Sequence, residues 1–62
     1  MINKLKYKRK QLDMSIYDIA KKTGLSPAYI SNLENKKRTN PTKDNMDKIA
    51  LALNTTTPEL FY

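Results

Sequence analysis

The residues of this chain that could do chemistry are amines and carboxylates, because its 62 residues include no histidine and no cysteine. Their absence excludes a disulfide scaffold, a zinc finger, and Ser-His-Asp or Cys-His catalysis. Most of the carboxylates stand where helix ends and helix dipoles favour them, namely Asp13, Asp18, Asp44 and Glu59. A single remaining carboxylate, Asp47, is not sufficient for an acid–base pair or a metal cluster. We therefore predict that the protein is not an enzyme and uses no metal and no cofactor.

Basic side chains are in excess, with twelve Lys and Arg against six Asp and Glu, a formal net charge of +6. This excess suits a polyanionic partner, because each neutralised phosphate releases condensed counterions. Charge alone does not separate DNA from RNA or from an anionic membrane. The sequence has neither an apolar run long enough to cross a bilayer nor the apolar start of a secretion signal. We expect a cytoplasmic protein with no membrane partner.

The apolar residues recur at helical spacing, and no segment alternates as a half-buried strand does. We predict an all-α fold, a single domain over residues 1–62 with five short helices. The first helix covers about residues 3–12, with Leu5, Arg9 and Leu12 on one face. Asp13 follows it, and Asp tolerates the left-handed conformation that the chain needs to leave a helix.

Capping residues and helix breakers mark the next two helices. Ser15, with Asp18 three residues later, predicts the start of the second helix. Gly24, the one glycine, ends this helix with a positive φ. Ser26 then caps the third helix, and Pro27 occupies its first position, where a missing N–H has no cost.

Similar signals delimit the last two helices. Thr42 caps the fourth helix, which ends at Asn54 and carries an inward stripe of Met46, Ile49, Ala50 and Leu53. Thr57 and Pro58 repeat the combination of cap and proline for a short fifth helix. Three outcomes are open for the apolar end of the chain: it closes the core, forms a dimer contact or forms a protein-binding patch. Its residues are Leu60, Phe61 and Tyr62.

Residues 16–35, IYDIAKKTGLSPAYISNLEN, have the pattern of two helices packed closely across a tight turn. Ala20 must be small where the third helix crosses it, and Gly24 must turn the chain. This stretch resembles the helix-turn-helix of the Cro/phage-repressor (XRE) family. The flanking segments KRKQLDMS, NMDKIALALN and TPELF are similar to the family's segments in the same order. The resemblance implies a compact, lambda-repressor-like domain that binds DNA and regulates transcription as a repressor.

The resemblance also implies that the third helix contacts base edges in the major groove. The positions that match the family's base-facing residues are Pro27, Ala28 and Asn32, flanked by Ser26, Tyr29 and Ser31. Asn32 is our candidate for direct readout, because its amide can both donate to and accept from adenine. Phage repressors often carry glutamine at the positions of Pro27 and Ala28, so this chain offers fewer hydrogen bonds to bases. Capping alone is an open alternative for Ser26 and Pro27, as is packing of the ring over the turn for Tyr29.

Phosphate contacts are expected at two places. The first is the start of the second helix, where free amides and the helix dipole favour anions, at Ser15, Ile16 and Tyr17. Ile16 stands where family members often carry glutamine, so its neighbours replace that hydrogen bond. The second place follows the third helix and comprises Asn35, Lys36, Lys37, Arg38 and Asn40. Lys36 stands where many relatives carry glycine, and Arg38 could instead enter a narrow minor groove.

In phage repressors of this family an Arg late in the first helix pairs with a Glu late in the third, and the matching residues are Arg9 and Glu34. Because Arg9 lies on the apolar face, its charge needs a partner if it is buried. The alternative is that both are ordinary surface charges. We expect a homodimer on double-stranded DNA with an inverted repeat. The competing hypothesis is an antitoxin or anti-repressor whose main partner is a protein, which a large exposed apolar patch would favour.

Overall fold

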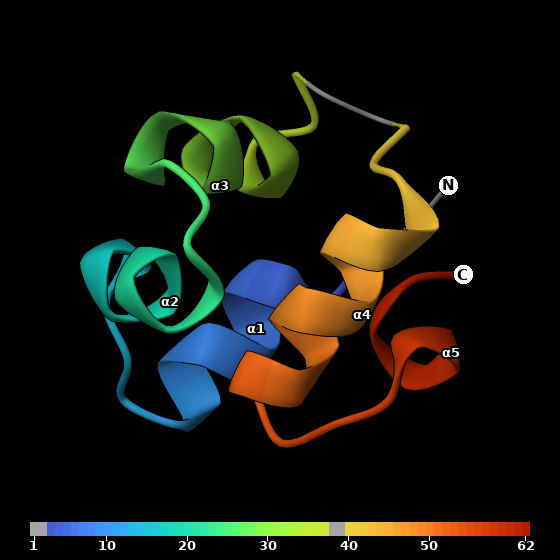
Figure 1. The fold of residues 1–62 in the computed structure, drawn as a ribbon. Helices are drawn as coiled ribbons and strands as arrows, with labels where there is room; N and C mark the ends of the chain where they lie inside the picture. The colour runs from blue at the N-terminus through green and yellow to red at the C-terminus, as the bar shows by residue number, and fades with distance from the viewer. Residues whose placement is uncertain (1–2, 38–39) are drawn as a thin grey trace.

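The computed structural model describes residues 3–37 and 40–62, and these form five helices with no strand. In chain order the helices are α1 (Leu5–Gln11), α2 (Ile16–Thr23), α3 (Pro27–Glu34), α4 (Lys43–Ala52) and α5 (Thr57–Leu60). Helices α1, α2 and α4 form the body, and α3 lies at one edge of it (Figure 1). The prediction of an all-α fold is confirmed. In the part of the chain that the structure describes, no helix is both long and apolar enough to cross a bilayer.

Every helix contributes apolar side chains to one core. Its members are Leu5, Ile19, Ala20, Ile30, Leu33, Ile49, Ala50, Leu53, Leu60 and Phe61. Leu60 and Phe61 therefore close the core, whereas Tyr62 is 55% exposed. Leu12 is 40% exposed, because α1 ends one residue before it and the chain turns away from the body there. The predicted apolar face of the first helix therefore does not extend to Leu12 as a buried residue.

The predicted starts of α2 and α3 are confirmed by their hydrogen bonds. At α2 the Asp18 amide donates to Ser15 Oγ over 3.0 Å, and the Ser15 amide donates to Asp18 Oδ2 over 2.9 Å, which makes a complete capping box. At α3 the Tyr29 amide donates to Ser26 Oγ over 3.0 Å, and Pro27 is the first helical residue. Both starts depend on residues three positions apart, so they form locally.

The last two helices begin in different ways. Thr42 caps α4 as predicted, since its hydroxyl accepts a hydrogen bond from the amide of Asn45. At α5 the N-cap is Thr56, and Thr57 is already the first helical residue. The prediction of Thr57 as the cap is therefore wrong by one residue. The reason is a tertiary contact, because the Thr57 hydroxyl donates to the carboxylate of Asp47 on α4.

Left-handed residues end four of the helices. Gly24 follows α2 with φ 77°, and Asp13, Lys36 and Asn54 follow α1, α3 and α4 with φ between 57° and 60°. Glycine adopts this conformation without a steric cost, and Asp and Asn tolerate it better than other residues. Lysine has no such advantage, so Lys36 holds its conformation against a local preference.

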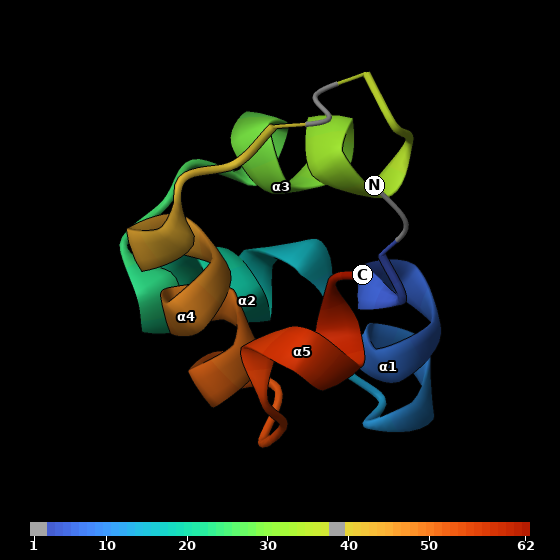
Figure 2. The same cartoon turned by 90° about the vertical axis from the view of Figure 1, so that its right-hand side faces the viewer.

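Helix α1 begins at Leu5, two residues later than predicted. The backbone before it pairs with the C-terminal segment: the Lys4 amide donates to the Leu60 carbonyl over 2.9 Å, and the side-chain oxygen of Asn3 accepts from the Leu5 amide. The Lys4 ammonium lies 5.4 Å from the centre of the Tyr62 ring. Figure 2 shows the start of α1 and the C-terminus side by side, below α3. This contact between distant residues takes the place of a first helical turn.

Candidate nucleic-acid interface

Helix α3 buries one side and exposes the other. Ile30 and Leu33 are fully buried on the inner side. On the outer side Pro27, Ala28 and Asn32 are exposed, and Ser31 is half-buried. In both views of the fold α3 lies at one edge of the molecule, with α1, α4 and α5 on its inner side (Figures 1 and 2). The exposed side of α3 is therefore open to a partner along the whole helix.

A two-point ion pair holds the C-terminal end of α3 against α1. Arg9 Nε lies 2.6 Å from Glu34 Oε2, and Arg9 Nη2 lies 3.0 Å from Glu34 Oε1. The Arg9 side chain is 13% exposed and the Glu34 side chain 3%. The remaining guanidinium nitrogen, Nη1, donates to the Met14 carbonyl over 2.9 Å, which ties the same arginine to the turn before α2. The hydrogen bond to Glu34 and the charge of its carboxylate raise the pKa of Arg9, so the guanidinium stays charged throughout the ordinary pH range.

Two further contacts fix the orientation of α3. The Tyr29 hydroxyl accepts a hydrogen bond from Asn45 Nδ2 on α4 over 3.0 Å, and the Tyr29 ring packs against the core. Asn3 Nδ2 donates to the Leu33 carbonyl over 3.2 Å. Neither asparagine stood out in the sequence, because each partner is at least sixteen residues away along the chain. Helix α3 is thus supported by α1, α4 and the segment before α1.

The polar groups on the outer side of α3 differ in how far they are already engaged. Ser26 Oγ accepts from the Tyr29 amide, and Ser31 Oγ accepts from Asn35 Nδ2 over 3.3 Å. The side-chain amide of Asn32 is exposed, and no residue in the described ranges hydrogen-bonds to it. Asn32 therefore presents both a donor and an acceptor to solvent.

The first turn of α2 lies beside this exposed side. A shallow groove between the two helices is lined by Ile16 and Tyr17 of α2 and by Pro27, Ala28 and Ser31 of α3. Tyr17 is 73% exposed, whereas Ile16 packs partly against the core. Helix geometry leaves the amides of Ile16 and Tyr17 without intrahelical acceptors. The structure therefore brings residues predicted for phosphate contact next to residues predicted for base contact.

The other predicted phosphate contacts adjoin the C-terminal end of α3. Asn35, Lys36, Lys37 and Asn40 are all exposed, and Arg38 lies outside the described residues. Two backbone hydrogen bonds shape this end: the Lys36 amide donates to the Leu33 carbonyl over 3.2 Å, and the Lys37 amide donates to the Asn32 carbonyl over 2.9 Å. This is a Schellman motif with Lys36 in the left-handed position. We call the exposed side of α3, residues 15–17 and residues 35–37 and 40 the α3 face.

The charges of α4 are paired on that helix. Lys43 Nζ lies 2.8 Å from Asp47 Oδ2, and Lys48 Nζ lies 3.1 Å from Asp44 Oδ2. The hydrogen bond from Lys43 lowers the pKa of Asp47, and a backbone hydrogen bond from Ser15 lowers the pKa of Asp18. Lys36 and Lys37, in contrast, have no carboxylate partner within residues 3–37 and 40–62. The α3 face thus has unneutralised positive charge at one end.

A family model described as helix-turn-helix matches residues 5–60, a range that begins with α1 and ends with α5. No curated protein matches the chain in a sequence comparison. The match covers most of the chain and includes the whole α3 face. The chain therefore belongs to the helix-turn-helix family of Cro/repressor-type, DNA-binding transcription regulators.

Proposed function

We propose that this protein is a repressor that reads an operator with α3 in the major groove. The observation that carries the proposal is the composition of the α3 face. The exposed side of α3 carries the side-chain amide of Asn32. On one flank are the backbone amides at the start of α2 that have no intrahelical acceptor, and on the other are the lysines Lys36 and Lys37. Base contacts specify a site and phosphate contacts position the protein, and this surface offers groups for both.

The dimensions of α3 suit this role. An α-helix with its side chains is about 10–12 Å across, and the major groove of B-DNA is about 12 Å wide. The Asn32 amide has the geometry for a two-point contact with adenine, and the methyl group of Ala28 suits a thymine methyl. Pro27 adds only apolar contact. With few hydrogen-bonding groups on the exposed side, we infer a modest base preference that favours A·T pairs.

The flanking groups would set the register of the helix on the duplex. Phosphate oxygens accept from the amides of Ile16 and Tyr17, where the dipole of α2 also favours an anion. Lys36 and Lys37 neutralise phosphates at the other end of α3 and release counterions. A homodimer would place two copies of α3 in successive major grooves, about 34 Å apart, on an inverted repeat. Occupying a promoter in this way would exclude RNA polymerase.

The proposal is tested by selecting bound sites from a random pool of duplex DNA. We expect enrichment of an inverted repeat whose half-sites are one helical turn apart, and we expect affinity to fall steeply with added salt. Enrichment of single half-sites would contradict the dimer. Duplex binding that is absent in dilute buffer would contradict the function and favour a protein as the main partner.

A further inference from the structure

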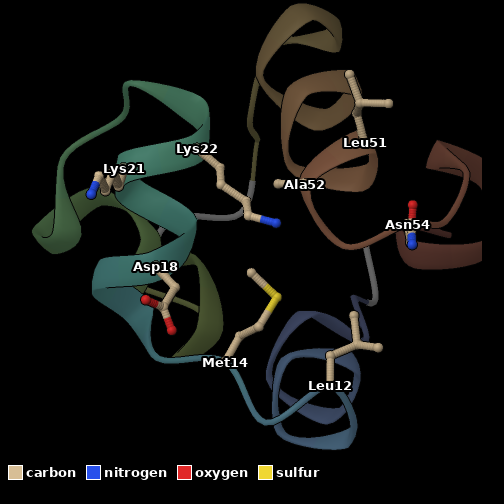
Figure 3. A pocket seen from close by; sticks show the side chains of 8 residues that line it. All are labelled: Leu12, Met14, Asp18, Lys21, Lys22, Leu51, Ala52 and Asn54. Carbon is tan, nitrogen blue, oxygen red and sulfur yellow. The ribbon is translucent and has the colours of Figure 1, made fainter.

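A second recessed surface lies where the ends of three helices meet, between the end of α1, the last turn of α2 and the end of α4 (Figure 3). Its floor is apolar and consists of Leu12, Met14, Leu51 and Ala52. We call this surface the α2–α4 hollow. A smaller recess continues it along α4 and shares Leu51 and Ala52. No residue of the hollow belongs to the α3 face.

The floor of the hollow includes large apolar side chains that are exposed to solvent. Leu51 is 78% exposed although it follows the buried residues Ile49 and Ala50, and Leu12 is 40% exposed. Figure 3 shows the Met14 side chain directed into the hollow from below and Ala52 facing it from α4. Single exposed apolar residues are ordinary, but apolar residues that gather in one recess are typical of binding surfaces. Methionine is well suited to such a floor, because its flexible side chain adapts to the shape of a partner.

The rim of the hollow is predominantly basic. Lys21 and Lys22 come from the last turn of α2; in Figure 3 the Lys22 side chain extends across the hollow, whereas the Lys21 side chain points away from it. The carboxylate on this rim, Asp18, is engaged by the Ser15 amide in the capping box of α2. Lys48 lies along α4 in the smaller recess, where its charge is balanced by Asp44. The charged residues that line the hollow, Lys21, Lys22 and Asp18, leave an excess of one positive charge, in a chain whose formal net charge is +6. An acidic occupant is therefore favoured over a basic one.

We infer that the α2–α4 hollow binds an acidic, amphipathic segment of a partner protein. An apolar side chain of the segment packs on the floor formed by Met14, Leu51 and Ala52, and a carboxylate beside it pairs with Lys22. A second copy of this chain fits less well, because a two-fold contact would bring the lysines of both copies together. Duplex DNA is also a poor occupant, because its charged phosphates would lie against the apolar floor and make no favourable contact with it. Since the hollow and the α3 face share no residue, a DNA-bound copy could hold the partner at the same time.

The test uses the isotope-labelled chain without DNA and a synthetic helical peptide that has a leucine stripe flanked by glutamates. We expect chemical-shift changes centred on Met14, Leu51 and Ala52. Two control peptides, one with glutamine for glutamate and one with serine for leucine, should bind about tenfold more weakly or worse, as expected when an anchor is removed. Because no DNA is present, the outcome does not depend on the proposed operator binding.

Matched variants locate the contact. Leu51→Ser and Lys22→Glu should each weaken peptide binding about tenfold. Their controls, Tyr7→Ser and Lys6→Glu, change an exposed tyrosine and an exposed lysine of α1 that do not line the hollow, and they should leave binding unchanged. Thermal melts followed by circular dichroism establish that each variant is folded.

Several results would overturn the inference. Shift changes centred on the α3 face, or an equal loss of binding in Lys22→Glu and Lys6→Glu, would reveal attraction to positive charge in general. Concentration-dependent changes at Leu51 without peptide would identify a second copy as the occupant. Displacement of the peptide by short duplex DNA, with shift changes in the hollow, would identify nucleic acid as the occupant.

Peptide binding that persists when duplex DNA is bound elsewhere would instead support two independent surfaces.

Discussion

The substitution Glu34→Gln tests whether the ion pair between α1 and α3 maintains the fold. The Glu34 carboxylate is 3% exposed and meets two nitrogens of Arg9, whose side chain is 13% exposed. Glutamine keeps the shape of glutamate but removes its charge. Its amide nitrogen would also face a guanidinium nitrogen, and two donors cannot hydrogen-bond to each other. Arg9 would then be left with a nearly buried, uncompensated positive charge.

The loss can be estimated from the burial of the pair. Breaking a buried ion pair by removing one partner destabilises a protein by about 3–5 kcal/mol. Because Arg9 retains some exposure, we expect about 3 kcal/mol, the lower end of this range. A chain of this length has a total stability of about 3–9 kcal/mol, so the loss is a third of it or more. The Tm should fall by about 12–24 °C, given about 4–8 °C per kcal/mol for a domain of this size.

The assay is thermal and urea unfolding, followed by circular dichroism, of Glu34→Gln, Arg9→Met and the double variant Arg9→Met/Glu34→Met. The double variant should be more stable than either single variant, because no orphaned charge remains in it. Lys48→Gln is the control, since it removes a solvent-exposed pair and should leave Tm nearly unchanged. Single variants as stable as this control, or a double variant whose losses add, would refute the reasoning.

Four further outcomes follow from the structure. Asn32→Ala should cost about 1–3 kcal/mol at the selected site and relax the base preference there, as measured by fluorescence anisotropy; an equal loss on all sequences would remove Asn32 from base readout. Lys37→Ala should instead weaken binding to every sequence, and it should reduce the slope of log binding constant against log salt concentration by about 1. Because the backbone hydrogen bond from Ser15 lowers the pKa of Asp18 in the fold, its carboxylate stabilises the protein at neutral pH, and this contribution disappears as pH falls through the lowered pKa. Asp18→Asn should therefore lower Tm at neutral pH and converge with the parent protein in acid; a constant difference would contradict this. Lys36→Gly should melt at the same or a higher temperature yet bind duplex DNA more weakly.

Helix starts could be predicted from the sequence because their chemistry is local. The caps at Ser15, Ser26 and Thr42 need only a backbone amide three residues away. The start of α1 could not be predicted in this way, because the backbone of Lys4 pairs with Leu60 at the far end of the chain. The start of α5 shifted for the same kind of reason, a tertiary hydrogen bond that local propensity does not contain.

The candidate site shows the same division. Helical periodicity alone separates the exposed side of α3 from its buried side. The partner of Tyr29, in contrast, is Asn45 on another helix, so its place against α4 required the three-dimensional structure. The α2–α4 hollow was also missed, because it forms only where the ends of three helices meet. Leu51 signals it weakly in the sequence, as an apolar residue beside the inward stripe of α4.

The end of α3 connects stability with the proposed function. Three helices end in a Schellman motif with a left-handed residue other than glycine, and two of these residues are Asp13 and Asn54, which tolerate that conformation. Lys36 does not, and for an ordinary residue the left-handed conformation costs about 1–2 kcal/mol. Glycine would remove this strain, although its more flexible unfolded chain would offset about 0.4–1 kcal/mol of the gain. Local stability therefore gives no reason for lysine here, whereas a positive charge beside the exposed side of α3 gives one. The strain at Lys36 is thus an observation that supports the proposed phosphate contact.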